Sequence, residues 1–186
     1  MKFRFFFIIF FIGLVSCSEQ QARRPISATK SHLVESTTAL LKKINTIEEI
    51  KIKNYIEKDS VHEYIRSPYG FWYHYIEKNH TDTITPSKDD VITLTYDVLD
   101  LSDQIIYSKE LIGVREYIVD KEDFIPGLQF GVKLMKEGET IKFIIPSFNA
   151  YGVIGDDDKI GINTSIISRV TSVSYTHLTL PTICSV

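Results

Sequence analysis

Asp123-Phe-Ile-Pro-Gly-Leu128 and, about one strand further along the chain, Ile144-Ile-Pro-Ser-Phe-Asn-Ala-Tyr-Gly152 are the two stretches that decide the fold. Each combines aromatic or aliphatic side chains with a proline and a glycine, which favour a turn. Apolar side chains held around two fixed turns form the kind of pocket that an apolar, kinked ligand requires. The two stretches therefore predict a binding site with aromatic and aliphatic walls.

The length and charge of the chain limit what it can be. With 186 residues it is long enough for one domain with a real core and an appendage. Because 21 basic residues stand against 24 acidic ones, for a net charge of -3, no strong field attracts an anionic partner. Nucleic acid is therefore not predicted as a partner.

The N-terminus is typical of an export signal. Lys2 and Arg4 precede an apolar run over residues 5–15 that is too short to span a bilayer comfortably. The run ends in Leu14-Val-Ser-Cys17, which resembles a bacterial lipobox and predicts a signal peptide over residues 1–16 with a lipid on Cys17. The alternative is an ordinary signal peptide in which Cys17 is a coincidence.

The residues around Cys17 bear on localisation and on disulfides. Ser18 follows Cys17, and in Gram-negative lipoproteins this usually goes with sorting to the outer membrane. We therefore predict an envelope protein anchored in the outer membrane and facing the periplasm, although either leaflet is compatible with the sequence. If Cys17 is acylated, Cys184 is the only other cysteine, and no intramolecular disulfide can form.

A tether and a helical segment follow the anchor. Residues 17–30 are polar and contain Arg23-Arg24-Pro25, so they read as a flexible tether. Residues 31–65 are predicted to be helical, with one helix over 31–44 and a second that Thr46 and Glu49 open as a capping box.

Apolar residues recur along this helical segment at spacings of three and four, which predicts a buried stripe. Its members are Leu40, Leu41, Ile44, Ile47, Ile50 and Tyr55. The stripe is expected to pack either on the rest of the chain or in a homodimer formed through residues 31–59.

Residues 66–172 are predicted to form the main domain. From Gly70 the hydrophobic period changes to two, which indicates strands. Between the later strands, residues 127–135 space their apolar side chains at helical intervals. The fold class is therefore α+β, with the predicted strands over 71–76, 91–99, 105–107, 116–119, 140–145 and 166–171.

The order of these elements and of four short motifs resembles the FKBP-type peptidyl-prolyl cis-trans isomerases over Pro68 to Thr171. The motifs are Phe124-Ile-Pro-Gly127, Leu134-Met-Lys-Glu-Gly-Glu139, Ile145-Pro146 and Ala150-Tyr-Gly152, with Thr95-Tyr96 in the second strand. Together with the lipobox, the chain looks most like the gliding-motility-associated FKBP-type lipoproteins of the Bacteroidetes.

The resemblance implies an antiparallel twisted sheet wrapped on one short helix, and a domain that turns X-Pro bonds in proline-containing clients. Rotation about an X-Pro bond is limited by amide resonance, with a barrier of ~18 to 20 kcal/mol, and breaks no bond. No nucleophile, metal or cofactor is therefore expected. An apolar pocket helps by removing water from the carbonyl and by holding the twisted bond better than either planar isomer.

The family's site residues carry over position by position. In this resemblance Tyr96 is a wall tyrosine, Ile125 offers a backbone N–H to the ligand, and the hydroxyl of Tyr151 donates to the substrate carbonyl. Tyr96 and Tyr107 could instead be core residues, since aromatics in half-buried strands more often are. The predicted catalytic residues are Tyr96, Tyr107, Ile125 and Tyr151, and the predicted substrate-binding residues are Tyr117, Phe124, Leu128 and Ile160.

Three positions depart from the family pattern. Leu128 stands where many active members have a tryptophan at the pocket floor. Ser108 replaces an aspartate that orients a tyrosine hydroxyl, and Ser168 replaces an aromatic residue of the last strand. These departures leave open an alternative function, a chaperone or assembly factor with this fold and weak or no activity.

No metal site is predicted. Asp156-Asp157-Asp158 lacks the asparagine, glycine and later glutamate of a calcium loop, so it is interpreted as a solvated acidic run. The histidines, which are His32, His62, His74, His80 and His177, are scattered without ligand spacing.

The end of the chain looks foreign. Val173-Ser-Tyr-Thr-His-Leu-Thr-Leu-Pro-Thr182 matches the translation of a transposase-type sequencing adapter. We therefore interpret residues 173–186 as an artefact to be kept out of the fold reasoning, although Val173-Ser-Tyr175 alternates well enough to prolong the last strand.

Overall fold

The structure is a computed structural model that describes residues 28–176, with side chains from residue 34 onward. It divides into a short N-terminal unit that ends at Ala39 and a larger unit that begins at Leu40. The predicted signal peptide, the lipidation residue Cys17 and residues 177–186 lie outside the described part. Within residues 28–176, no helix combines the length and apolar character that a membrane crossing needs.

The helical segment is one helix, α2 (Ala28–Lys58), so the prediction of two helices is wrong. The segment contains neither glycine nor proline to interrupt it. The hydroxyl of Thr46 does not cap a new helix; it donates to the carbonyl of Lys42 at 2.8 Å, one turn back. Glu49 pairs instead with Lys53 at 3.3 Å and with Arg66 at 3.4 Å.

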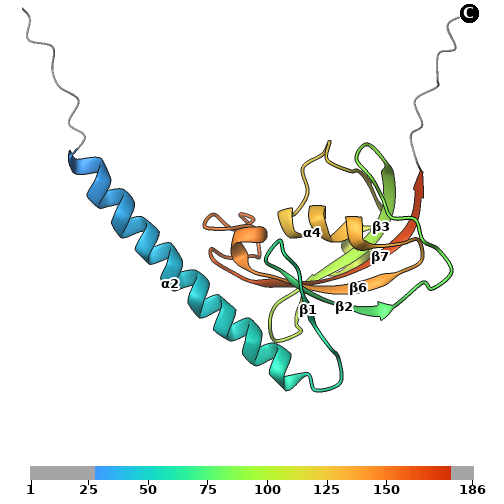
Figure 1. Cartoon of the computed structure of the whole chain (residues 1–186), viewed down its shortest axis with the longest axis horizontal. Helices are drawn as coiled ribbons and strands as arrows, with labels where there is room; N and C mark the ends of the chain where they lie inside the picture. Colours follow the sequence, from blue (N-terminus) through green and yellow to red (C-terminus); the bar gives the residue numbers. More distant parts are fainter. Residues whose placement is uncertain (1–27, 177–186) are drawn as a thin grey trace, which may run out of the picture. The chain divides into compact units, whose positions relative to one another are not determined.

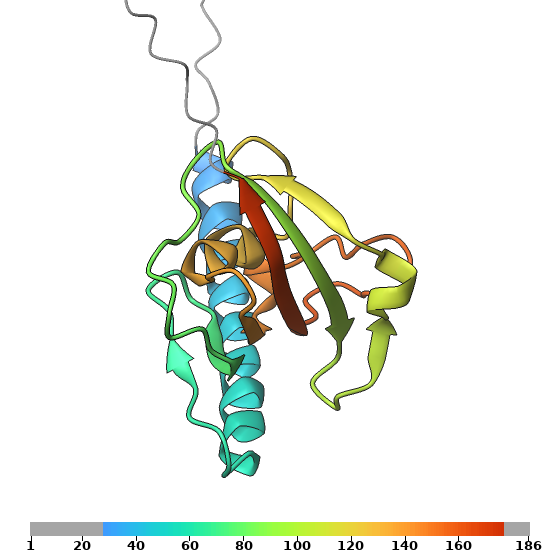
Figure 2. The same cartoon turned by 90° about the vertical axis from the view of Figure 1, so that its right-hand side faces the viewer.

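The main domain is built on an antiparallel sheet in the order β1-β2-β6-β7-β3-β4, in which β5 also pairs with β3. Figures 1 and 2 show this sheet, with β3 and β7 side by side. The expected α+β fold and its strands are confirmed, whereas β1 and the short helix α3 (Lys109–Ile112) were not predicted. The strands are β1 (Ile65–Arg66), β2 (Trp72–Glu77), β3 (Val91–Leu99), β4 (Ile105–Tyr107), β5 (Arg115–Ile118), β6 (Thr140–Ile145) and β7 (Ile166–Thr176).

One face of the sheet packs on the late helix predicted from the sequence. This helix is α4 (Pro126–Gly131), and a 3-10 turn, η1 (Val132–Leu134), continues it. Gly127 lets α4 approach β6 closely, because a Cβ there would lie 2.6 Å from Cγ2 of Ile145. The main core between sheet and helix includes Leu94, Val98, Leu128, Val132, Met135, Ile141, Phe143, Ile145, Ile166 and Val170.

A second, smaller core lies where the larger unit's part of α2 meets the sheet. Ile52 is fully buried there and packs with Trp72, Leu99, Ile144 and Ile167. Four members of the predicted stripe do not pack on the rest of the chain, because the packed face of α2 runs through Glu48, Ile52 and Tyr55 instead. The exposed members are Leu40, Leu41, Ile47 and Ile50.

The last strand runs to Thr176, so the expectation that residues 173–175 prolong it is confirmed. Tyr175 is paired with Ile92 of β3. Its hydroxyl donates to the carboxylate of Asp82 at 3.2 Å and lies 3.3 Å from the carbonyl of Ile84. Residues 173–176 therefore have defined places in the sheet, whatever their origin.

Candidate functional site

All eight predicted site residues belong to the main core or pack against it, and together they are called the apolar cluster below. Six of them are buried, and the other two, Tyr107 and Tyr151, are partly exposed at the edge of the cluster. The buried ones are Tyr96, Tyr117, Phe124, Ile125, Leu128 and Ile160. Residues that are up to 64 positions apart in the chain, Tyr96 and Ile160, thus belong to one apolar core.

Phe124 is the centre of the aromatic part of this cluster. Its ring meets that of Tyr96 edge-on at 5.4 Å and 82°, and lies 5.1 Å from the ring of Tyr117. The guanidinium of Arg115 lies over the ring of Phe124 at 4.8 Å. The same guanidinium donates to the carbonyl of Asp123 at 3.2 Å. Phe124 is therefore held on several sides.

The start of α4 fixes the backbone of Ile125. Its carbonyl accepts hydrogen bonds from the N–H groups of Leu128 at 2.8 Å and Gln129 at 3.0 Å. The side chain of Gln129 donates to the carbonyl of Phe124 at 2.9 Å. Among the described residues, none accepts a hydrogen bond from the N–H of Ile125, so this donor remains available to a ligand.

Tyr151 supplies a second available donor. Its side chain is half-buried against the apolar cluster, and no described residue of 34–176 is hydrogen-bonded to its hydroxyl. Burial raises the pKa of Tyr151 above the usual tyrosine value, and the nearby Tyr96 and Asp156 add to the shift. The phenol is therefore a neutral hydrogen-bond donor beside apolar walls.

Asp156 organises the loop that closes the cluster. Its carboxylate accepts hydrogen bonds from the hydroxyl of Tyr107 and from the N–H groups of Ile160 at 2.7 Å and Asp158 at 3.0 Å. Although partial burial alone raises its pKa, these hydrogen bonds hold the pKa of Asp156 below its usual range. The interpretation of residues 156–158 as a merely solvated run is therefore wrong for Asp156.

A buried carboxylate that the sequence analysis missed anchors the same loop from α2. Glu48 is 4% exposed and accepts hydrogen bonds from the N–H and hydroxyl of Ser147 at 2.8 and 2.6 Å. The hydroxyl of Ser165 donates to it at 3.1 Å. Ser147 and Ser165 bracket the loop that carries Tyr151 and Ile160. No pattern in the sequence indicated this role, because the predicted stripe of the helix does not include Glu48.

The three departures from the family pattern have structural roles here. Leu128 is fully buried in the cluster. Ser108 caps α3 by accepting from the N–H of Leu111 at 3.3 Å, and so does not orient a tyrosine. Ser168 is fully buried, and its hydroxyl donates to the carbonyl of Asp97 at 2.7 Å.

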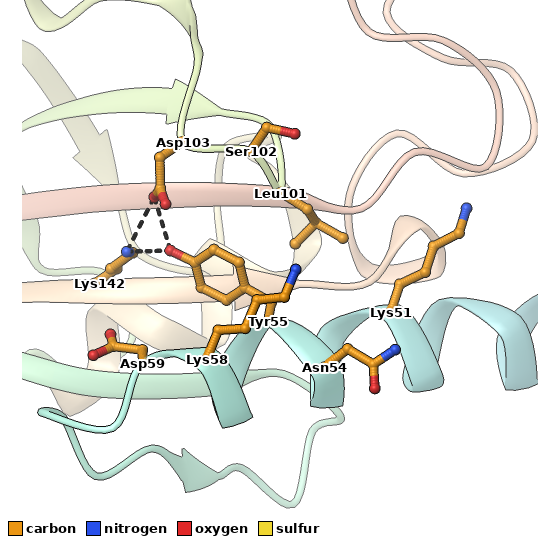
Figure 3. A pocket seen from close by; sticks show the side chains of 9 residues that line it. All are labelled: Lys51, Asn54, Tyr55, Lys58, Asp59, Leu101, Ser102, Asp103 and Lys142. Atoms are coloured by element: carbon orange, nitrogen blue, oxygen red, sulfur yellow. Dashed lines mark hydrogen bonds and ion pairs between the residues drawn. The ribbon is translucent and has the colours of Figure 1, made fainter.

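A large hollow lies away from this cluster, on the side of α2. It has a volume of about 670 Å³ and is lined from α2 and from the β3–β4 turn. Figure 3 shows the hydroxyl of Tyr55, the ammonium of Lys142 and the carboxylate of Asp103 meeting at its edge, with Tyr55 donating to Asp103 at 2.7 Å. Its lining is polar and charged, so it does not match the apolar pocket that the sequence predicts.

The link between Tyr107 and Asp156 gives a testable pH dependence. Because the pKa of Asp156 is depressed in the folded state, its contribution to stability is complete above the ordinary value of about 3.9 and is lost as the pH falls through the lower folded value. We expect Asp156→Asn to lower the urea midpoint of unfolding at pH 7 and the difference from wild type to shrink below about pH 4. A difference that stays constant from pH 7 to pH 3 would contradict this role.

Comparisons with known proteins agree with the fold and with the motif order. The family model for FKBP-type peptidyl-prolyl cis-trans isomerases matches residues 82–171. The chain is 35% identical, over 85 residues that make up 46% of it, to the probable FKBP-type peptidyl-prolyl cis-trans isomerase FkpA of Neisseria meningitidis. It is 33% identical over 67 residues, 36% of the chain, to the FKBP-type isomerase SlyD of Treponema pallidum. The matched regions span 31% and 38% of those two proteins.

Solved structures show the same fold at low sequence identity. FkpA from Escherichia coli superposes with a TM-score of 0.59 at 23% identity, over 95% of this chain and 82% of that one. A peptidyl-prolyl isomerase from Pseudomonas syringae also gives a TM-score of 0.59, at 15% identity, over 73% of this chain and 96% of that one. The expected architecture, with a helix before the sheet, is thereby confirmed.

Proposed function

We propose that residues 82–171, which match the family model for FKBP-type peptidyl-prolyl cis-trans isomerases, catalyse rotation about X-Pro bonds in other polypeptides. The observation that carries this proposal is the single apolar cluster that contains Phe124 and Ile125 beside the free hydroxyl of Tyr151. Clients are chains that present a proline to this cluster. No cofactor takes part in the proposed reaction.

Each part of the cluster has a task in this reaction. The rings of Tyr96 and Phe124 exclude water from the amide, whose hydration favours the planar form. The N–H of Ile125 and the hydroxyl of Tyr151 donate to client carbonyls and hold the chain while the bond turns. Since the barrier arises from amide resonance, this desolvation and positioning accelerate rotation without covalent chemistry.

A protease-coupled assay with a proline peptide tests the proposal. We expect the chain without its predicted signal peptide and Cys17 to accelerate isomerisation, and Tyr151→Phe to reduce kcat/KM by roughly tenfold through loss of one donor to the carbonyl. Tyr73→Phe is the matched control, because Tyr73 lies on β2 outside the predicted site. A rate equal to background for the wild type would refute catalysis.

A second candidate function is that of a chaperone or assembly factor. Such a protein would use this fold to bind clients but would not isomerise their X-Pro bonds. Tyr96, Phe124 and Ile125 each expose only 8% of their surface and Leu128 exposes none, so little of the cluster is open. If this candidate is right, a client will bind equally well to wild type and to Ile125→Ala, and neither will accelerate isomerisation.

We also propose the envelope role that the sequence predicts. The lipobox supports a lipid on Cys17 and anchoring in the outer membrane, and the resemblance to gliding-motility lipoproteins supports clients in that machinery. Uncatalysed X-Pro isomerisation takes tens of seconds or more, which is slow enough to limit the folding of exported chains. Incorporation of labelled palmitate by wild type but not by Cys17→Ser tests the anchor.

The exposed apolar residues of α2 support the proposed homodimer through residues 31–59. Leu40 is 58% exposed and Ile47 is 53% exposed, seven positions further along, which places them on one side of the helix. We expect sedimentation to give a dimer for the wild type and a monomer for Leu40→Glu with Ile47→Glu. A monomeric wild type would contradict the proposal.

The adapter interpretation of residues 173–186 also stays a proposal. Its support is the match of Val173–Thr182 to a translated sequencing adapter. Amplification of the gene from its source DNA tests it, and finding the same tail in the genome would reject it.

A further inference from the structure

Two histidines and an aspartate that the sequence separates come together beside the end of α2. Asp59 follows α2, His62 lies in the next turn, and His74 lies on β2. One ligand atom of each lies within 4.8 Å of the others, and the two imidazole rings stack at 4.4 Å with 22° between their planes. We propose that Asp59, His62 and His74 form a binding site for a divalent transition-metal ion such as Zn²⁺.

Neighbouring groups orient these ligands as the outer shell of a metal site does. The hydroxyl of Tyr64 donates to Oδ2 of Asp59 at 2.9 Å. Nδ1 of His74 lies 3.4 Å from the carbonyl of Tyr75, and a proton on Nδ1 leaves Nε2 free to bind a metal. Ligating histidines commonly donate their other ring N–H to a backbone carbonyl in this way.

The ligand set suits zinc. Two imidazoles and one carboxylate bind Zn²⁺ at about 2.0 to 2.2 Å, and a water takes the remaining tetrahedral position. Such bonds place the ligand atoms roughly 3.4 Å apart, so the cluster has to contract. His74 is 5% exposed and stays fixed, whereas the side chain of His62 is 48% exposed and can move toward the ion.

The charges around the cluster are compatible with a cation. Asp59 contributes a negative charge, and its carboxylate oxygens both lie 2.9 Å from Nδ1 of His62. Lys142 is the partner of His74 on the neighbouring strand β6, and its ammonium is paired with the carboxylate of Asp103 at 3.2 Å. A bound ion would link the residue after α2 to strand β2, on the face of the sheet opposite the apolar cluster. It would therefore stabilise the junction between helix and sheet.

Zinc titration calorimetry on the tag-free chain without its predicted signal peptide and Cys17 tests the site. We expect one ion per chain for the wild type and for His80→Ala, which removes an exposed histidine outside the cluster. His62→Ala should bind at least about tenfold more weakly, and zinc should raise the melting temperature of the wild type but not that of this variant. His62 is exposed, so its removal leaves the core intact.

Asp59→Asn is a second variant, which removes the negative charge of the side chain but keeps its shape. It should also weaken zinc binding. The proposal is overturned if the wild type binds no zinc at micromolar concentrations, or if His62→Ala and Asp59→Asn bind as tightly as the wild type. Binding that is lost equally in His80→Ala would place the ion elsewhere and would overturn it too.

Discussion

Replacement of Glu48 with alanine is expected to lower the free energy of unfolding by roughly 3 kcal/mol, because buried donors lose their acceptor. The N–H and hydroxyl of Ser147 and the hydroxyl of Ser165 all donate to this carboxylate. Water cannot replace the carboxylate easily, since Glu48, Ser147 and Ser165 are each buried. The loss should also free the loop that carries Tyr151 and so reduce kcat/KM.

Urea unfolding and the isomerase assay together measure this effect. Glu49→Ala is the matched control, because Glu49 is the next residue and makes ion pairs with the exposed side chains of Lys53 and Arg66. Such pairs contribute little, so we expect a change below about 1 kcal/mol. Glu48→Gln, which keeps one acceptor oxygen, should fall between the two. Equal stability of Glu48→Ala and Glu49→Ala would contradict the role of Glu48.

Gly155→Ala is expected to have the second large effect, on the loop itself. Gly155 has φ +84, and a Cβ there would lie 2.4 Å from the carbonyl oxygen of Ile160. That oxygen accepts from the N–H of Asp156 at 3.1 Å, so the backbone cannot move away without breaking the turn. We expect the free energy of unfolding to fall by roughly 3 kcal/mol, because backbone strain and overpacking act together. We also expect kcat/KM to fall, because Ile160 would leave the cluster.

Gly138→Ala separates strain from clash. Gly138 has a similar φ of +77, but a Cβ there meets nothing within 4 Å. Gly138→Ala should therefore lower the free energy of unfolding by only about 1 kcal/mol, because only the left-handed backbone is strained. It should leave kcat/KM unchanged. If Gly155→Ala behaves like Gly138→Ala in both measurements, the close approach to Ile160 does not matter for the site.

The strands and the cluster were predictable because their signals are local. In β3 and β6 the pattern of apolar residues reflects which faces of the strand are buried. This pattern can be recognised within a few consecutive residues of the sequence. Pro126 and Gly127 mark a turn by their own backbone preferences. The family resemblance that these motifs carry then implied that Tyr96, Ile125 and Tyr151 share a site, and all three lie in or against the same core.

The polar groups that hold the site were not predictable, because their partners are distant in sequence. Glu48 is 99 residues from Ser147, and Tyr107 is 49 residues from Asp156. A carboxylate in a helix or in an acidic run looks solvated until the fold places donors around it. His62 and His74 likewise meet only after the turn behind α2 reverses the chain.

Exchange NMR on a short proline peptide, with the protein at a small fraction of the peptide concentration, tests the central claim most directly. It reads the cis and trans forms of the same peptide without a coupling protease. Uncatalysed interconversion takes tens of seconds or more, so catalysis by the cluster around Phe124 and Ile125 predicts exchange at least about tenfold faster with the wild type. An exchange rate equal to that of the peptide alone would contradict the account.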